Sequence, residues 1–366
     1  MPHAPLTIAG SYNPEDVTFL LKPVQITPTD VRTKEKLIQS GAAHYSEMIS
    51  LERRPDERYL NIFEQACEKG RVRIAREVLA LARRIADRVL EGSLEHQITL
   101  CSLVRAGVPY GVLLQRELSA IGVDTMHYGI SIIRDRGLDG NAIDFVLAHR
   151  PPGGVVFVDG WTGKGAISAE LGKSWLEITG RGCVELVVLA DPGGFASMSG
   201  SNEDWLIPSG ILGANVSGLI SRSILNEDVI GSDDFHGSIV VEHLSDIDVS
   251  LDYVDRITQI MSEIRGTESA EASKPDKKAL REKALSSVNS IAEIYEVGNR
   301  NRIKPGIAEA TRAILRRQPE RAFIRSFDDP DLDALIHLCR SDDVELVVDA
   351  SLTGPYRAIT LIEKLS

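Results

Sequence analysis

The chain has 366 residues, of which 43% are hydrophobic and 5% aromatic, which suits one α/β domain and a smaller second domain. Its four cysteines are scattered and lack Cys-x-x-Cys spacing, which argues against a zinc ribbon or a disulfide framework and favours a reducing compartment. The chain does not open with a basic region and an apolar core, and no apolar run approaches the roughly 20 residues needed to span a bilayer. We therefore predict a cytoplasmic protein without a membrane partner.

The charge is distributed unevenly along the chain. The net charge is −12, but the segment from Lys277 to Arg325 contains 12 Lys or Arg against 5 Asp or Glu. That segment carries +7, which leaves −19 for the rest of the chain. An acidic body with one basic segment indicates that the basic part meets an anion such as RNA, unless these charges form an ordinary solvated helix face.

The first ninety residues predict local structure more clearly than chemistry. Residues 17–21 form a short candidate strand, and His44 lies in a polar patch as either a base or ligand or, more simply, part of a solvated face. Apolar residues recur at helical spacing from Tyr59 to Leu90, where we expect Gly70 to break the helix. Packing explains this stripe without any function.

A buried strand is expected next, at Ile98–Leu103, followed by a turn that contains Arg105 and Gly107 and leads into a helix. Arg105 could pair with phosphate oxygens through its planar fork, while Gly107 keeps the backbone close to them. The alternative is an arginine that caps an ordinary turn.

A second strand-like run, Met126–Ile133, is followed by a charged and glycine-rich loop. Arg134 and Arg136 are placed to supply a mobile lid over a ligand. Asp135 and Asp139 could instead pair with these arginines within an exposed loop, so both interpretations stay open.

The strongest single motif begins at Val155–Val158, an apolar run typical of a strand buried on both faces. Asp159 ends this strand, a turn rich in glycine follows, and a helix with Leu171 and Trp175 on one face comes next. Backbone amides converge in such a turn, and the helix amino terminus adds unpaired donors, so the pattern predicts a phosphate site. The spacing matches neither a Walker loop nor a Rossmann fingerprint.

Another strand is expected at Val184–Ala190, with Asp191 directly after it. Ligands in open α/β sheets collect beyond the carboxyl ends of the strands, which makes Asp191 a candidate ligand contact. Ser217 and Arg222 lie in a later polar, glycine-rich segment and are candidates for a cover over the site.

The turn after Val158 resembles the phosphoribosyl-pyrophosphate loop of type I phosphoribosyltransferases. Asp159 and the run 162–166 match that loop, whereas Gly160 stands where most of that family has a second carboxylate. The resemblance implies that Asp159 holds the ribose hydroxyls and that Arg105 and Gly107 belong to a pyrophosphate loop, with Arg134 and Arg136 in the lid. It also implies that the 5′-phosphate is held by the backbone of Thr162, Gly163, Lys164, Gly165 and Ala166. The missing carboxylate leaves open whether the site turns over or only binds.

A set of short motifs lies within residues 11–261: Ile38–Gly41, His44–Glu47, Ile132–Gly137 and Val216–Arg222. As a set they resemble the phosphoribosyltransferase-like family of bacterial tellurite-resistance and stress gene clusters, also labelled StiP and described as a cysteine protease. The resemblance implies a type I phosphoribosyltransferase fold and synthesis of a nucleoside-like metabolite. The protease label finds little support in the residues, because Cys101 lies mid-strand and only Cys67, with His44 or His236, is a conceivable nucleophile.

Beyond a polar stretch, the carboxyl-terminal part predicts a helix after Pro305, strands at residues 322–324 and 344–348, a helix between them, and a last helix that begins at residue 352. This part resembles the Pelota-type RNA-binding module. Relatives of that module contact RNA with Gly-x-Asn-Glu-x-x-Lys, and Gly306, Glu309 and Arg312 match this frame, although Ala308 replaces the Asn. With Arg302 and Lys304 they are the expected RNA-binding residues.

We therefore predict an α/β fold, with a type I phosphoribosyltransferase-like parallel sheet flanked by helices over residues 1–265, which include an amino-terminal extension at 1–55. A linker at 266–286 and a Pelota-like α/β/α sandwich at 287–366 complete the chain. The predicted function is a phosphoribosyltransferase in a stress context that uses phosphoribosyl pyrophosphate or a related sugar phosphate, with Mg²⁺ held through that substrate rather than by the protein. The alternatives are a non-catalytic phosphoribosyl-ligand sensor associated with RNA, and a cysteine protease.

Overall fold

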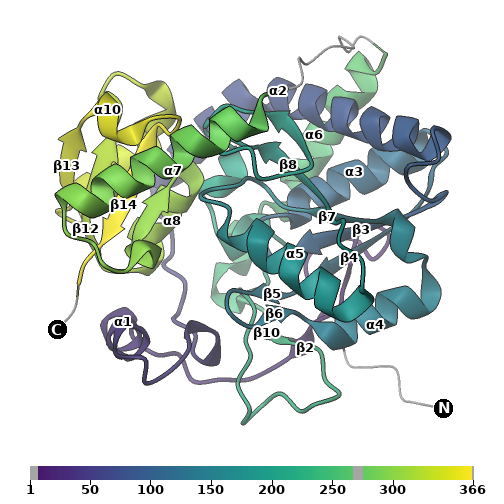
Figure 1. The fold of residues 1–366 in the computed structure, drawn as a ribbon, viewed down its shortest axis with the longest axis horizontal. Helices are drawn as coiled ribbons and strands as arrows, with labels where there is room; N and C mark the ends of the chain where they lie inside the picture. The colour runs from purple at the N-terminus through teal and green to yellow at the C-terminus, as the bar shows by residue number, and fades with distance from the viewer. Residues whose placement is uncertain (1–6, 267–274, 365–366) are drawn as a thin grey trace.

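The computed structural model describes residues 7–266 and 275–364, which form a larger amino-terminal domain and a smaller carboxyl-terminal domain side by side (Figure 1). A six-stranded sheet forms the centre of the larger domain, with the order β1-β4-β3-β7-β8-β9 and parallel pairing throughout. Its strands are β1 (Thr18–Phe19), β3 (Gln97–Leu103), β4 (Asp124–Ile130), β7 (Val155–Val158), β8 (Glu185–Ala190) and β9 (Met198–Ser201). Within the described ranges no helix is long and apolar enough to cross a membrane.

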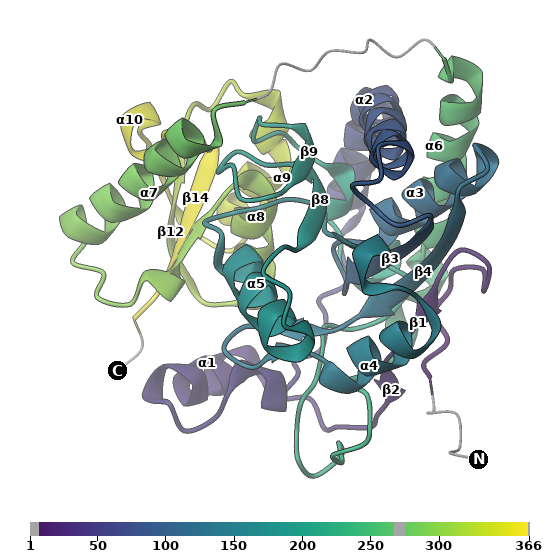
Figure 2. The same cartoon turned by 45° about the vertical axis from the view of Figure 1, so that its right-hand side comes forward.

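Helices cover both faces of this sheet, which confirms the predicted fold class. One face packs against α2 (Glu57–Leu90), α3 (Val108–Ala120) and α6 (Ser250–Ile264), and the other against α4 (Gly140–His149) and α5 (Ala166–Thr179) (Figure 2). Neighbouring residues of one strand alternate between the two cores, as Leu100 and Cys101 do in β3. Parallel strands buried on both sides explain the nearly continuous apolar runs in the sequence.

Gly70 does not break the first long helix, so that prediction is wrong. α2 runs unbroken for 34 residues. A methyl group at Gly70 would lie 3.4 Å from the Pro208 ring, which shows how closely the helix packs there. The buried stripe of α2 outweighs the roughly 1 kcal/mol that a glycine costs inside a helix.

Shorter elements cover the carboxyl edge of the sheet. They include α1 (Val31–Ser40) and two small two-stranded sheets. One of these pairs β2 (Lys22–Pro23) with β10 (Gly237–Ser238), and the other pairs β5 (Ile132–Ile133) with β6 (Gly137–Leu138). Residues 48–56, between α1 and α2, adopt neither helix nor strand; we call them the strap.

The smaller domain is a four-stranded sheet in the order β11-β14-β12-β13, with helices on both faces. Its elements are α7 (Lys277–Ile294), β11 (Ile303–Pro305), α8 (Ile307–Arg316), β12 (Pro319–Ile324), α9 (Asp333–Ser341), β13 (Glu345–Val348), α10 (Ala350–Thr353) and β14 (Ala358–Ile362). The strands at β12 and β13 and the helix between them match the predictions.

Two predictions for this domain are wrong. The last helix ends after four residues at Thr353, because Gly354 and Pro355 follow it, and the β-branched run 358–362 becomes the central strand β14. The predicted linker, residues 266–286, overlaps α7, because this helix begins at Lys277. Residues 267–274 of that segment lie outside the described part of the chain.

The two domains share one apolar core. Figure 2 shows α8 and α9 between the smaller sheet and the larger domain, with α7 on the outer side. Residues of α8 and α9 belong to the same buried cluster as those of α2. Asp204 of the larger domain accepts hydrogen bonds from the backbone of Ile307 at 3.1 Å and of Arg357 at 2.7 Å. The domains are therefore docked through their cores and through a buried carboxylate.

Gly107, expected to approach a pyrophosphate, is instead required by packing. A Cβ at this position would lie 2.0 Å from the Val158 carbonyl oxygen, so the β3–α3 turn fits against β7 only without a side chain. We expect Gly107→Ala to destabilise the protein by about 1–3 kcal/mol, measured as a lower melting temperature. Gly172→Ala in α5, where no atom lies within 4 Å of the added methyl group, is the control and should be neutral or stabilising. Equal melting temperatures for both variants would contradict this assignment.

Candidate functional site

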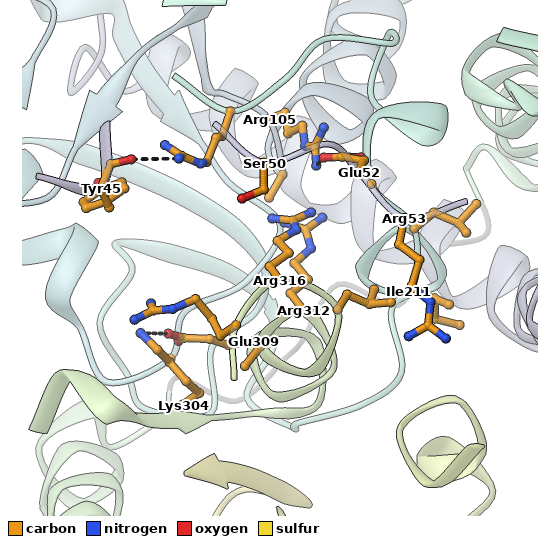
Figure 3. Close-up of a pocket in the computed structure, with 18 of the residues that line it drawn as sticks. Tyr45, Ser50, Glu52, Arg53, Arg105, Ile211, Lys304, Glu309, Arg312 and Arg316 are labelled. Carbon is orange, nitrogen blue, oxygen red and sulfur yellow. Dashed lines mark hydrogen bonds and ion pairs between the residues drawn. The ribbon is translucent and has the colours of Figure 1, made fainter. Parts of the chain in front are cut away.

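A cavity of about 380 Å³ lies between the two domains, at the carboxyl ends of β3 and β7. Four parts of the chain enclose it: α1 with the strap, the turns after β3 and β7, the segment 211–222, and the carboxyl-terminal domain through β11 and α8. Figure 3 shows Arg312 and Arg316 of α8 pointing toward Ser50, Glu52 and Arg105 on the opposite wall. The cavity is therefore complete only when the two domains are docked.

The walls of this cavity are strongly cationic. Eleven Lys or Arg residues line it against four carboxylates. The cations are Lys34, Arg53, Arg54, Arg105, Arg134, Lys164, Arg222, Lys304, Arg312, Arg316 and Arg317, and the carboxylates are Glu52, Asp56, Asp159 and Glu309. Since the chain as a whole carries a net charge of −12, this concentration of positive charge is local to the cavity.

The cationic side chains repel one another and are shielded from water. Burial and neighbouring cations lower the pKa of Lys34 to about 8 and that of Lys304 to about 7, although Glu309 lies 3.6 Å from the Lys304 Nζ. Burial and Arg105 also lower the pKa of Arg312 to about 10 and that of Arg316 well below its usual range. Burial is the largest cause of each of these pKa shifts, and neighbouring cations add to it.

The two arginines of α8 lie one helical turn apart and face the cavity. The Arg312 guanidinium lies 4.6 Å from the centre of the Trp161 ring and donates to the Ser209 carbonyl at 3.3 Å, while its Nε has no partner in the described chain. Arg316 donates no hydrogen bond to any described residue, although it lies close enough to Glu52 to lower the pKa of that carboxyl. Donors on both side chains therefore remain available to a bound molecule.

Arg105 has partners on the protein itself. Its guanidinium donates to the Glu52 carboxylate and, at 2.8 Å, to the Ile220 carbonyl, while its Nε has no partner in the described chain. Burial alone would raise the pKa of Glu52, but the positive charges of Arg105 and Arg316 lower it to about 2. Glu52 is thus an ionised carboxylate at the centre of the arginine cluster.

The turn after β7 lines the cavity, as predicted, but most of its groups are used to dock the carboxyl-terminal domain. The Gly163 carbonyl accepts a 3.0 Å hydrogen bond from the Tyr356 hydroxyl, and Lys164 Nζ donates to the Ile303 carbonyl at 3.0 Å. A Cβ at Gly163 would lie 2.5 Å from a Glu309 carboxylate oxygen. Gly165 has a φ of +81°, which suits glycine, and Ala166 begins α5.

Asp159 ends β7 and also lines the cavity. Its carboxylate accepts a hydrogen bond from the Gly160 amide at 2.8 Å, but burial raises its pKa to about 7. Asp159 is therefore partly protonated at neutral pH, which weakens the predicted role of a fixed anion that holds sugar hydroxyls.

The remaining predicted ligand contacts divide into two groups. Arg134 and Arg222 line the cavity, and Arg222 donates to the Tyr45 carbonyl at 2.7 Å. Arg136 is exposed and pairs with Glu47 at 3.2 Å. Asp191 and Ser217 are fully buried away from the cavity, and Asp191 accepts from the Thr162 hydroxyl and from the Phe195 and Ala196 amides, so it holds the turns together.

The predicted RNA-binding residues do not form an open surface in this arrangement. Lys304, Glu309 and Arg312 line the cavity, and Gly306 is buried beside Asp204. Arg302 donates to the Ile362 carbonyl at 2.8 Å and pairs with Glu320 at 3.0 Å. Docking against the larger domain covers the start of α8.

Sequence reasoning missed Glu52, Lys34 and the inward direction of Arg316. Lys34 and Glu52 lie in the amino-terminal extension, where no motif marks them, and only domain docking directs Arg316 inward. No group of three potential metal ligands occurs among the described residues, and the predicted Mg²⁺, which the substrate rather than the protein would hold, stays a prediction.

None of the four cysteines lines the cavity. Cys67, Cys101 and Cys339 are buried, and burial raises the pKa of the Cys67 and Cys101 thiols far above the usual range and that of Cys339 to about 12. Cys183 is exposed, in the turn before β8. Cys67 borders a small separate pocket between α2 and α6, and no histidine is among the described residues that line it.

Comparison with known proteins gives two family matches. Residues 10–258 match the family described as "Tellurite-like stress resistance cysteine protease StiP", and residues 282–364 match the PELOTA RNA binding domain. A relative from Acinetobacter baylyi, named "Cysteine protease StiP", is 46% identical over 98% of this chain and 94% of its own length.

Solved structures give a weaker likeness. A mutant of hypoxanthine phosphoribosyltransferase from Trypanosoma cruzi, complexed with the product IMP, is 16% identical, with a TM-score of 0.27 over 35% of this chain and 70% of that chain. A second structure of that enzyme with IMP is 15% identical, with a TM-score of 0.29 over 36% and 76% of the two chains. These scores are too low to support an argument about activity.

The predicted phosphoribosyltransferase activity is therefore corrected. Both the family description and the name of the relative specify a cysteine protease, and neither mentions pentosyl transfer, phosphoribosyl pyrophosphate or magnesium. The structure offers a physical reason, because the turn that resembles a phosphoribosyl-pyrophosphate loop binds the carboxyl-terminal domain and lacks a second carboxylate at Gly160.

Asp159 gives a pH-dependent test of the site's electrostatics. Because its folded pKa is about 7, above the usual 3.8, the folded protein binds more protons than the unfolded chain between these values, and its stability falls as pH rises through this interval. We expect Asp159→Asn to raise the melting temperature relative to the wild type, by more at about pH 8 than at about pH 6. A melting-temperature difference that is the same at both pH values would contradict the raised pKa.

Proposed function

Because the chain belongs to the family described as tellurite-like stress resistance cysteine protease StiP, and ends in a Pelota RNA-binding domain, we propose a function in which both domains take part: their shared cavity binds an organic anion. The observation that carries this proposal is the excess of eleven cations over four carboxylates around one cavity, an excess that remains although Arg53, Arg54 and Arg317 pair with carboxylates outside the lining. Several of these cations have pKa values lowered by burial and by neighbouring cations, and a bound anion would favour their charged forms.

The walls also indicate what kind of anion fits. Arginines with free donors favour phosphate or carboxylate oxygens, which their planar guanidinium groups bind in pairs. Apolar side chains, among them Ile38, Ile49, Leu212 and Trp161, line the rest of the cavity. A volume of about 380 Å³ lies in the usual range for small-molecule sites. The ligand we propose is therefore a phosphorylated or carboxylated small molecule with an apolar part. The cavity binds this molecule and does not convert it.

The carboxyl-terminal domain provides a separate route to RNA. Since docking covers the start of α8, we propose that RNA contacts the exposed arginines of this domain, Arg300, Arg325 and Arg340, rather than Arg312. Exposed arginines attract the phosphate backbone of RNA in a salt-dependent manner.

A second candidate function is the peptidase activity named for the relative, which the identity of 46% over nearly the whole chain favours. A cysteine nucleophile must be accessible and must reach a base. Cys183 is exposed and Cys67 borders a small pocket, so these two thiols are the candidates that the structure offers.

The anion-binding proposal predicts that inorganic pyrophosphate stabilises the folded protein. A ligand that binds only the folded state raises the melting temperature by mass action. We expect millimolar pyrophosphate to raise the melting temperature of the wild type, and we expect Arg316→Gln to lose most of that increase. Arg76→Gln, at an exposed position on α2, is the matched control and should respond like the wild type. An identical response of the Arg316 variant and the wild type would contradict binding in this cavity.

The peptidase candidate is tested by substitution of its thiols. If Cys67 or Cys183 is the nucleophile, hydrolysis of a fluorescent casein substrate should disappear in Cys67→Ser or in Cys183→Ser and in iodoacetamide-treated wild type. If both variants hydrolyse the substrate as fast as the wild type, neither thiol is the nucleophile.

A further inference from the structure

The carboxylate of Glu52 lies among the arginines of the cationic cavity, although Glu52 belongs to the strap rather than to the turns at the end of the sheet. Its Oε1 accepts from the Arg105 guanidinium, and its Oε2 accepts from the Ala214 amide at 2.9 Å. The backbone carbonyl of Glu52 accepts from His243 Nε2 at 2.9 Å. A side chain with two anionic oxygens is thus held by a guanidinium and a backbone amide, which are the donors that bind a ligand carboxylate or phosphate.

The cavity wall has room for this group only because of a glycine. A Cβ at Gly213 would lie 2.3 Å from Glu52 Oε2 and 3.2 Å from the Arg105 guanidinium nitrogen. The cradle therefore consists of Arg105, the Ala214 amide and the bare backbone at Gly213. Arg316 faces the same point from the other domain, as Figure 3 shows, and donates no hydrogen bond to a described residue.

The strap is anchored before Glu52 by the buried Ile49, whose carbonyl accepts from the Thr29 amide, whereas after Glu52 it is held mostly by surface contacts. Leu51 is 65% exposed, and Arg53 pairs with Asp342 of the carboxyl-terminal domain at 2.8 Å. Arg54 pairs with Asp246 of the larger domain, and the side chains of both residues are at least half exposed. Exposed ion pairs contribute little to stability, so the part of the strap after Glu52 can shift at small cost.

From this geometry we infer that Glu52 is a built-in competitor: its carboxylate occupies the subsite for the ligand's anionic group, and a ligand binds there by displacing it. This inference rests on the proposed anion-binding function and identifies the donors of its central subsite as Arg105, Arg316 and the Ala214 amide. An exchange of one anion for another keeps the charge of the arginine cluster partly compensated in both states. Glu52 thereby sets the affinity of the site and excludes monoanions that bind too weakly to displace it.

The test measures binding of inorganic pyrophosphate and of citrate by isothermal titration calorimetry, with the full chain as wild type, Glu52→Gln and Glu52→Asp. We expect Glu52→Gln to bind at least one of these anions about tenfold more tightly than the wild type, since the internal competitor is gone. Glu52→Asp keeps the charge but shortens the side chain, so its affinity should lie between those of the wild type and Glu52→Gln. It also provides a second variant if Glu52→Gln does not fold. Tighter binding of pyrophosphate than of citrate would identify a phosphate subsite, and the reverse a carboxylate subsite.

Two control variants separate the subsite from general electrostatics. Glu57→Gln removes an exposed carboxylate directly after the strap and outside the cavity lining, and should bind like the wild type. Gly213→Ala, which fills the cradle, should abolish the gain in affinity when combined with Glu52→Gln. Equal affinities of wild type and Glu52→Gln, or an equal gain in Glu57→Gln, would overturn the inference and leave anion binding in place. Failure of every variant to bind either anion would overturn both.

Discussion

The cavity between the two domains is built around a cluster of arginines from both domains, with one glutamate at its centre. Arg105 lies at the end of a strand in the larger domain, Arg312 and Arg316 lie on a helix of the smaller one, and Glu52 is the carboxylate between them. Buried charges of one sign are costly unless they are paired or unless a ligand completes the pairing. One carboxylate compensates only part of this charge, as the lowered pKa values of Arg312 and Lys304 show. Docking of the two domains, which the shared apolar core and Asp204 hold together, therefore brings these charges into one cavity and creates a site for an anion.

The turn after β7 connects this cluster to the domain interface. Strand, acidic residue and glycine-rich turn are arranged as the phosphate-binding interpretation requires, but Gly163 and Lys164 bind groups of the smaller domain and Asp159 has a raised pKa. In this chain the turn that resembles a phosphate-binding loop contacts the smaller domain instead. The relatives give a consistent result, since the family and the relative are named for a cysteine protease and not for transfer of a pentose.

Much of the fold could be predicted from the sequence, because buried parallel strands such as β3 and β7 are continuous apolar runs and α2 shows a long apolar stripe. The motif also placed Asp159 and Arg105 correctly at one edge of the sheet. Tertiary context decided the rest. Gly70 stays helical because α2 packs tightly, residues 358–362 become a central strand, and Arg312 points into a cavity rather than toward RNA. Lys34 and Glu52 could not be found, since only the docking of distant segments gives them a role.

The most direct test of this account is a crystal structure of the full chain grown with inorganic pyrophosphate. We expect density for the anion between Arg105 and Arg316, with the Glu52 side chain moved out of the cradle at Gly213. Density for pyrophosphate elsewhere on the surface, with Glu52 still bound to Arg105, would contradict the central claim that this cavity is an anion site.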